Sequence, residues 1–328
     1  MAKLIFSFFL MFIYGAIRID YGTDYAPYEE AFDYFHNSSI DAIFASGKEP
    51  AYLLLNKIMP SYRTLLVFLS AFTCFTYGWL FYKYIPTKYY WLGFLLMAVS
   101  GGNMLYFQLT GLRNAIAINI MTLSIPLIRS RKILPFLGLM GLAYLFHNSV
   151  IFYMPLAYFF ATPHKIKFYS VIISILIIVA LLVMSTSTMI NNIAPYISTY
   201  FEKYSIYIDT VPVIANKFNF LMSCFLALTL TVSFIVLIRE DLLDYENILF
   251  KLSLLFLFSF ILGVLNFRMT QYFAPYLLVG TTVVLSRVRN VILKYSYVGA
   301  ILSFSIYSFI LYVGLSDFPF ANFHTIFE

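Results

Sequence analysis

The stretch YRTLLVFLSAFTCFTYGWLFY, residues 62–82, decides the class of this chain. It carries a single charged side chain, Arg63, and a helix of roughly 20 apolar residues can cross about 30 Å of bilayer hydrocarbon. The rest of the 328-residue chain is similar, since 62% of its residues are hydrophobic and 11% are charged, against about 25% charged in a soluble domain. The composition indicates an all-α integral membrane protein and excludes a soluble enzyme, a disordered tail and a nucleic-acid-binding module.

Apolar segments of this kind recur along the whole chain and predict about eleven transmembrane helices, within a range of ten to twelve, in one membrane domain over 1–328. The first segment follows Lys3 as in a signal peptide, but no small-residue cleavage pattern comes after it, so we expect it to be retained. The predicted cores are 4–16, 62–82, 89–100, 113–128, 133–146, 150–161, 168–185, 217–238, 251–265, 271–286 and 295–314.

The distribution of cations predicts the orientation, because cytoplasmic loops of membrane proteins are enriched in Lys and Arg. With the N-terminus in the cytoplasm, 13 of the 21 cations fall on the inner side, and the two sides carry net charges of +9 and −3. The two long connections, 18–61 and 186–216, are then predicted to be outside, with a short amphipathic helix at Tyr28–Phe35 in the first. The main inner clusters are Lys83–Lys88, Arg129–Lys132 and Arg287–Lys294.

Six ionisable residues stand at or near the predicted outer ends of the helices. Three of them are arginines, and the enrichment of cations in cytoplasmic loops does not account for arginines on the outer side. Each has a structural alternative as an interfacial side chain, a turn or cap residue, or a packed histidine. Arg113 is the hardest to explain in this way, because an ionised group in an otherwise apolar helix is costly without a wet cavity or a partner. The six are Arg18, Asp24, Glu49, Arg113, His147 and Arg268.

Together these residue types suit a phosphate-bearing substrate. Several converging guanidinium groups can hold a diphosphate without a metal, and a nearby carboxylate or imidazole can take a proton from an attacking hydroxyl. No metal site or cofactor is expected, because the sequence has no HExxH motif and no paired aspartate motif. Cys74 and Cys224 both lie in apolar runs, which indicates neither a disulfide nor a thiolate metal site.

An ordered set of short motifs resembles the EpsG-type polysaccharide proteins over roughly 18–285. That family belongs with the Wzy-type polymerases of O-antigen, capsule and exopolysaccharide repeat units. The outer segment 186–216 carries no arginine motif and so departs from relatives with arginine-rich loops. The matching motifs are Arg18 with Gly22-x-Asp24-Tyr25-x-x-Tyr28, Glu49-Pro50-x-Tyr52 with a later Leu-Asn, Arg113-x-x-Ile-Ala, Ala143-x-x-x-His147-x-Ser, and Arg268-x-x-x-Tyr272.

The resemblance implies a GT-C-like glycosyltransferase of the bacterial cytoplasmic membrane whose site faces the periplasm or the outside. It would transfer a growing glycan from undecaprenyl diphosphate onto a lipid-linked oligosaccharide repeat unit, alongside a flippase and a chain-length regulator of the same pathway. The implied roles are diphosphate binding by Arg18, Arg113 and Arg268, proton abstraction by Asp24 or Glu49 in preference to His147, and sugar contact by Tyr28, Tyr52 and Tyr272.

Three other functions fit a polytopic protein with outer-face charges. A flippase or transporter of the same lipid-linked sugar would suit the span count, but no inverted repeat is visible and the ionisable groups gather at the outer ends. An O-antigen ligase and a membrane O-acyltransferase remain as enzymes with other acceptors or donors. The acyltransferase requires a site open to the cytoplasm, whereas His147 is predicted to face outward.

Overall fold

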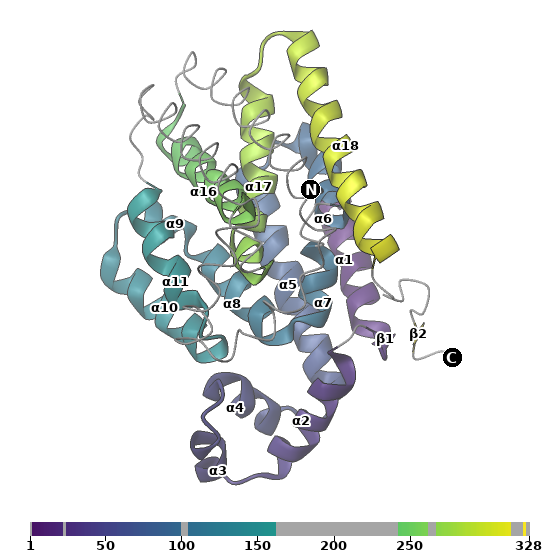
Figure 1. The fold of residues 1–328 in the computed structure, drawn as a ribbon, viewed down its shortest axis with the longest axis vertical. Coiled ribbons are helices and arrows are strands. Elements are labelled where there is room, and N and C mark those ends of the chain that lie inside the picture. The colour runs from purple at the N-terminus through teal and green to yellow at the C-terminus, as the bar shows by residue number, and fades with distance from the viewer. Residues whose placement is uncertain are drawn as a thin grey trace, which may run out of the picture. The chain divides into compact units, whose positions relative to one another are not determined.

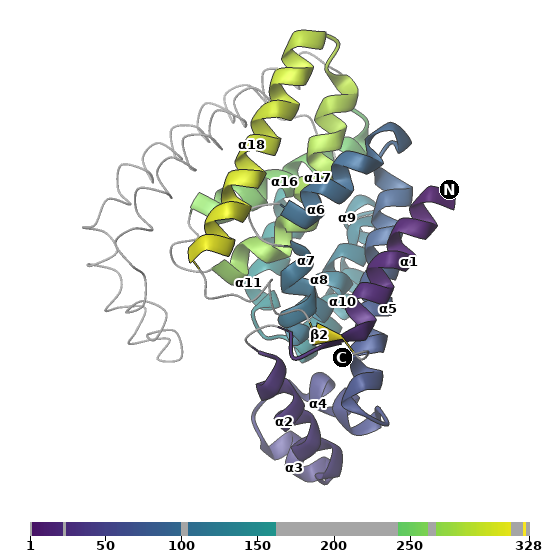
Figure 2. The same cartoon turned by 90° about the vertical axis from the view of Figure 1, so that its right-hand side faces the viewer.

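The structure is a computed structural model that describes residues 2–21, 24–99, 104–161, 242–261, 267–315 and 324–325. The described chain is mostly helical, as predicted, and it divides into two compact units. The first contains Met1–Thr162 and Ser305–Glu328, and the second Pro163–Phe304. Each unit is described separately below, and Figures 1 and 2 show their elements from two directions.

The first unit is built from short and medium helices and a two-stranded sheet in which β1 pairs antiparallel with β2. Its elements are α1 (Ala2–Ile17), β1 (Arg18–Ile19), α2 (Tyr25–Asn37), α3 (Ile40–Ala45), α4 (Pro50–Ile58), α5 (Tyr62–Tyr84), η1 (Thr87–Tyr89), α6 (Tyr90–Val99), α7 (Met104–Thr110), α8 (Leu112–Leu123), α9 (Ile125–Arg129), α10 (Ile133–Phe146), α11 (Val150–Pro155), the π-helix η2 (Leu156–Phe160) and β2 (His324–Thr325).

Helix α5 is the centre of this unit, because α1 and α8 both pack on it and α10 packs on α8. Polar side chains link α8 to α5 inside the apolar core, where the Asn119 amide donates to Thr73 Oγ1 at 3.0 Å. Hydrogen bonds of this kind commonly join helices within membranes. Where α1 packs on α5, a Cβ added to Gly15 would lie 2.8 Å from Ser70 Oγ, so glycine is needed for this close helix contact.

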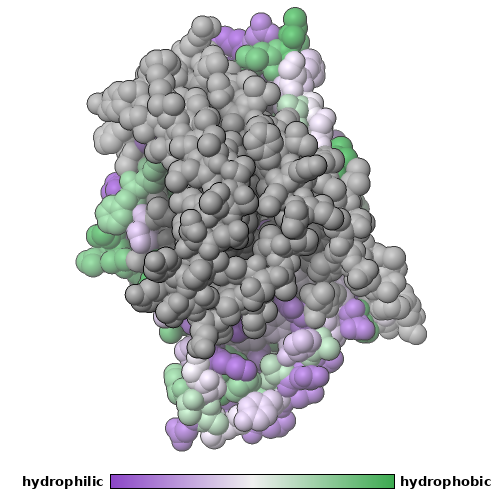
Figure 3. All heavy atoms as spheres, viewed as in Figure 1, coloured by the Kyte–Doolittle hydropathy of each residue, from purple (hydrophilic) through white to green (hydrophobic). Residues whose placement is uncertain are grey.

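The segment between α1 and α5 folds into α2, α3 and α4, which lie together at one end of the unit (Figures 1 and 2). Local sequence sets its helix starts: the Ser39 hydroxyl accepts from Ala42 N at the start of α3, and Pro50 stands in the first turn of α4. Hydrophilic side chains gather over this segment in Figure 3. The helix predicted at Tyr28–Phe35 is confirmed as α2.

The second unit contains α16 (Asp244–Ile261), α17 (Phe267–Arg287) and most of α18 (Val291–Leu315), whose last residues belong to the first unit. α16 and α17 pack so closely that a Cβ added to Gly280 would overlap the side chain of Ser253. Bulkier residues at this crossing would force the two helices apart, so Gly280 fixes their separation.

Nine of the eleven predicted cores coincide with described helices, and the other two, 168–185 and 217–238, lie outside the described residues. The core predicted at 113–128 is divided into α8 and α9 next to Pro126. Within the described part of the chain, α5 is long and apolar enough to cross a membrane, while α1, α10 and the stretch Val291–Ser303 are apolar but shorter. The number of spans and the orientation stay predictions.

Candidate active site

Three of the predicted site residues meet around the carboxylate of Glu49, which directly precedes α4 and is 7% exposed. Arg113 Nη1 donates to Glu49 Oε2 at 2.6 Å, and His147 Nδ1 lies 3.2 Å from Oε1. We call Glu49, Arg113 and His147 the Glu49 cluster. Each member comes from a different helix end, and 98 residues separate Glu49 from His147 along the chain.

Helix boundaries place these three side chains. Pro50 starts α4 immediately after Glu49, and Gly111 precedes α8 so that Arg113 stands in its first turn. His147 is the C-cap of α10, where its backbone turns to an extended conformation and its N–H donates to Ala143 O. Because α4 and α8 both pack on α10, the three helix ends converge on one polar cluster.

The Glu49 carboxylate is held in its ionised form. Burial alone would raise the pKa of Glu49, but the hydrogen bond from His147 and the charge of Arg113 outweigh burial and lower this pKa to about 2. A carboxylate of such low basicity is a poor proton acceptor near neutral pH. Glu49 is therefore suited to orienting its two partners rather than to removing a proton.

The contact with Glu49 also sets the tautomer of His147. A carboxylate only accepts hydrogen bonds, so Nδ1 of His147 carries the proton that faces it, and in the neutral ring Nε2 is left with a free lone pair. Among the described residues, neither His147 Nε2 nor Arg113 Nε has a hydrogen-bond partner, although both atoms are buried. The cluster thus leaves one acceptor and one cationic donor unused.

Two tyrosines extend the cluster. The Arg113 guanidinium carbon lies 5.7 Å from the centre of the Tyr28 ring, within the range of a cation–π contact. The rings of Tyr28 and Tyr52 lie 5.7 Å apart in an edge-to-face arrangement. Tyr52 is 1% exposed, so its ring supports Tyr28 rather than offering an open face for a sugar. Tyr28 is half-buried and remains the candidate for substrate contact.

Arg18 and Asp24 occupy different places from the Glu49 cluster. Arg18 is 1% exposed, and its guanidinium donates to Gly15 O and, at 3.1 Å, to Ser70 Oγ, which joins α1 to α5. Burial lowers the pKa of Arg18 to about 10. Asp24 is exposed at the N-cap position of α2, one helical turn before Tyr28. Diphosphate binding by Arg18 and proton abstraction by Asp24 stay predictions.

The last two predicted site residues lie on α17, in the second unit. Arg268 is in the first turn of this helix, with a side chain outside the described part of the structure, and Tyr272 is fully buried one turn later. Their roles at the site likewise stay predictions.

Asn114 is a polar residue that sequence reasoning missed. It is buried directly after Arg113, and neither atom of its amide has a partner within the described part of the chain. Its position directly after Arg113, which the sequence already singles out, was the available signal. Among the described residues, no group of three His, Cys, Asp or Glu side chains could hold a metal ion.

Comparison with known protein families supplies the wider context. Residues 2–325 match the model of the EpsG family, which is nearly the whole chain. The chain belongs to the EpsG family. EpsG is a family of Wzy-like polymerases, so the resemblance to this family is confirmed and membership indicates polymerase-like activity in membrane polysaccharide biosynthesis. No curated protein and no solved structure gives a significant match.

Proposed function

We propose that this EpsG protein is a metal-independent, GT-C-like glycosyltransferase of the bacterial cytoplasmic membrane that polymerises lipid-linked oligosaccharide repeat units at its outer face. The growing glycan is transferred from undecaprenyl diphosphate to a sugar hydroxyl of a second lipid-linked repeat unit. The observation that carries this proposal is the Glu49 cluster, because it combines an unused proton acceptor with an arginine in a protein of a Wzy-like family.

His147 is the base that the geometry supports best, in place of the carboxylates preferred from the sequence. Its Nε2 has a free lone pair, while Nδ1 is fixed by the Glu49 carboxylate, which orients the ring and stabilises the imidazolium that forms on protonation. Glu49 is a positioning residue in this mechanism, because its own basicity is too low for proton abstraction.

In the transfer step, the acceptor hydroxyl oxygen forms a bond to the anomeric carbon of the donor sugar. The bond between that carbon and the diphosphate oxygen breaks, and the electron pair leaves with the diphosphate. The hydroxyl proton passes to His147 Nε2. Arg113, whose side chain is 33% exposed, is placed to stabilise the charge that develops on the leaving diphosphate, with Arg268 as a second donor in this proposal.

In-vitro elongation tests the proposal. Purified protein is reconstituted in liposomes with undecaprenyl-diphosphate-linked repeat units, and the products are resolved by gel electrophoresis. We expect a ladder of glycans that differ by one repeat unit, with undecaprenyl diphosphate as the second product. EDTA should leave the ladder intact. A reaction that stops with EDTA and resumes with Mg²⁺ would show that the arginine-only site is wrong.

The same liposomes separate polymerisation from transport. Movement of the lipid-linked unit across the bilayer without any ladder would replace the polymerase by a flippase. Transfer of the glycan to a lipid A acceptor, again without a ladder, would identify an O-antigen ligase instead.

A further inference from the structure

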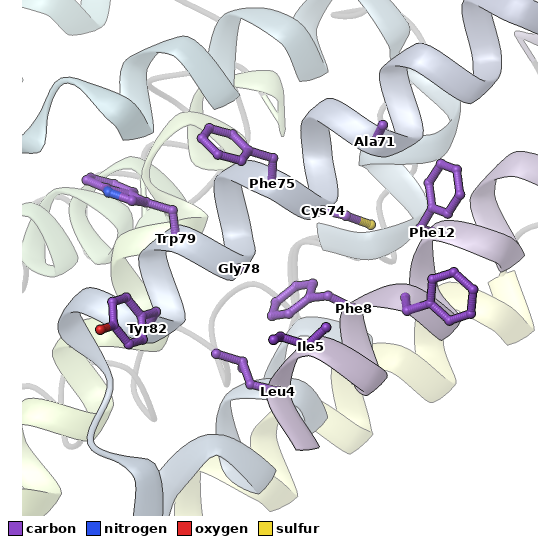
Figure 4. Close-up of a pocket in the computed structure, with 11 residues that line it drawn as sticks. Leu4, Ile5, Phe8, Phe12, Ala71, Cys74, Phe75, Gly78, Trp79 and Tyr82 are labelled. Atoms are coloured by element: carbon purple, nitrogen blue, oxygen red, sulfur yellow. The ribbon is translucent and has the colours of Figure 1, made fainter. Parts of the chain in front are cut away.

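An apolar groove of about 590 Å³ lies between α1 and α5 (Figure 4). Leu4 and Phe8 of α1 form one wall, and Gly78, Trp79 and Tyr82 of α5 belong to the other. Every lining side chain is apolar or aromatic apart from the thiol of Cys74. Such a groove suits a flexible hydrocarbon chain rather than a sugar or a nucleotide.

The groove follows the two helices from Leu4 to Phe12 on α1 and from Ala71 to Tyr82 on α5. Beyond Phe12 the helices come close together, because a Cβ added to Gly15 would lie 2.8 Å from Ser70 Oγ, and the Arg18 guanidinium donates to both residues. At Gly78 an added Cβ would meet the Phe8 ring at 3.6 Å, an ordinary contact distance. The apolar lining of the groove is therefore continuous over about three turns of each helix.

Positive charge stands at the end of the groove that holds Leu4 and Tyr82. The exposed Lys83 ammonium lies 5.4 Å from the Trp79 ring centre, and Trp79 itself lines the groove. Lys3, also exposed, directly precedes Leu4. Trp, Tyr and Lys at the end of a membrane-crossing helix lie at the depth of the lipid headgroups, and a lysine there attracts anionic lipid.

We propose that this groove binds an anionic phospholipid, with one acyl chain between α1 and α5 and the phosphate at Lys83. The lipid carrier of the polymerisation reaction fits less well, because in the proposed function its diphosphate belongs at Arg113, beside Glu49 and Tyr28, whereas the cation beside the groove is Lys83 in the last turn of α5. The phospholipid site does not depend on the proposed activity.

Tryptophan fluorescence provides a direct test, because the chain has only two tryptophans, Trp79 and Trp91. Trp91→Phe leaves Trp79 as the sole reporter in the groove. The full-length variant is reconstituted in phosphatidylcholine vesicles that contain a minor fraction of brominated phosphatidylglycerol or, in parallel, of brominated phosphatidylcholine. We expect the brominated anionic lipid to occupy the groove, and to quench Trp79, about fivefold more effectively.

Lysine variants in the Trp91→Phe background test whether the stronger quenching by anionic lipid arises in the groove. Lys83→Gln should abolish it. Lys88→Gln should keep it, because this exposed lysine lies over Tyr89 and not over a groove residue. Trp79→Phe, which leaves Trp91 as the reporter, should show no preference for the anionic lipid.

Filling the groove gives an independent readout. Gly78→Leu should remove the quenching preference, whereas Gly141→Leu on α10, where an added Cβ meets nothing within 4 Å, should preserve it. Equal quenching by the two brominated lipids, or a preference that survives Lys83→Gln, would overturn the proposal. Displacement by undecaprenyl phosphate at lower concentration than by unlabelled phosphatidylglycerol would assign the groove to the lipid carrier instead.

Discussion

Two glutamate–arginine pairs in this protein have nearly the same geometry and different surroundings. Glu49 and Arg113 meet at 2.6 Å with side-chain exposures of 9% and 33%, and Glu246 and Arg287 meet at 2.5 Å with exposures of 6% and 30%. Distance and burial alone would give both pairs the same role. The difference lies in the hydrogen-bonding atoms that each pair leaves unused.

Both carboxylate oxygens of Glu246 accept hydrogen bonds, from Arg287 and from the backbone just before α16. Arg287 donates through Nε and Nη2 to both carboxylate oxygens, and Leu243 N donates to one of them at 2.8 Å. Glu49 instead divides its oxygens between Arg113 and His147, each of which keeps a buried nitrogen without a partner among the described residues. A fully satisfied pair stabilises structure, whereas unused polar atoms mark a site that can receive a substrate.

The largest expected effect separates the two arginines. Arg113→Ala should lower turnover by about 10³-fold, because it removes the cation proposed to stabilise the leaving diphosphate. Arg287→Ala should leave the turnover of folded protein within about twofold but reduce the free energy of unfolding by about 3 kcal/mol, because Glu246 is then buried without its partner. Elongation assays and thermal unfolding of both variants measure the contrast, and wild-type elongation by Arg113→Ala would contradict the diphosphate assignment.

The same two measurements, elongation and thermal unfolding, show whether Arg268 contributes to turnover, as proposed for Arg113, or to stability, as expected for Arg287. As a diphosphate ligand, Arg268→Ala should lower turnover by about 10²-fold or more with little change in expression or unfolding temperature. Elongation at the wild-type rate, or a loss that follows only from unfolding, would remove Arg268 from the proposed site.

His147 should show an effect of about 10²-fold on kcat with little change in KM. His147→Asn retains a donor near the position of Nδ1, so it can still bond Glu49, and it lacks the Nε2 acceptor. We expect this variant to be as stable as wild type and nearly inactive. An active Asn variant would show that the imidazole only orients Glu49 and Arg113.

The acid stability of the protein should depend on Glu49. Its folded-state pKa of about 2 lies below the ordinary glutamate value, so ionised Glu49 stabilises the fold above about pH 4.5, and this contribution is lost as the pH falls toward 2. Glu49→Gln should cost about 2 kcal/mol near neutral pH, after allowance for the solvent at Arg113. Unfolding profiles of the variant and the wild type should converge between pH 4.5 and 2, and a constant gap would contradict the assignment.

The smallest effect concerns the ring beneath Arg113. Tyr28→Phe keeps the aromatic face and should change turnover by less than about twofold, whereas Tyr28→Ala removes the cation–π contact and should cost about 1 kcal/mol in kcat/KM. Equal losses in both variants would transfer the role from the ring to the hydroxyl.

The positions of the long, uniformly apolar helices could be predicted from the sequence. The core predicted at 62–82 became α5, Tyr62–Tyr84, because the apolar run and its Ser61 cap agree. The apolar run at 113–128 predicts one helix, but the chain forms α8 and α9 there, and Pro126 stands in the first turn of α9. The apolar content of a segment indicates that it is suited to a membrane, but it does not indicate where a helix is interrupted.

The candidate site was only partly accessible from the sequence. Glu49, Arg113 and His147 were each identified from residue type and position, since charged groups in apolar surroundings are rare. Their mutual contacts depend on how α4, α8 and α10 pack, which no local pattern specifies. The sequence favours Asp24 or Glu49 over His147 as the base, because residue type alone does not show which groups are in contact. The contacts of Glu49 with Arg113 and His147 favour His147 over Glu49.

The two-stranded sheet joins the beginning of the chain to its end, since Arg18 pairs with Thr325 and Ile19 with His324. During biosynthesis the first strand emerges long before the second, so this pairing forms after all the helices between them have been made. The contacts among Glu49, Arg113 and His147 involve no residue beyond 147 and can form much earlier. The Glu49 cluster can therefore assemble before the chain closes on itself through the sheet.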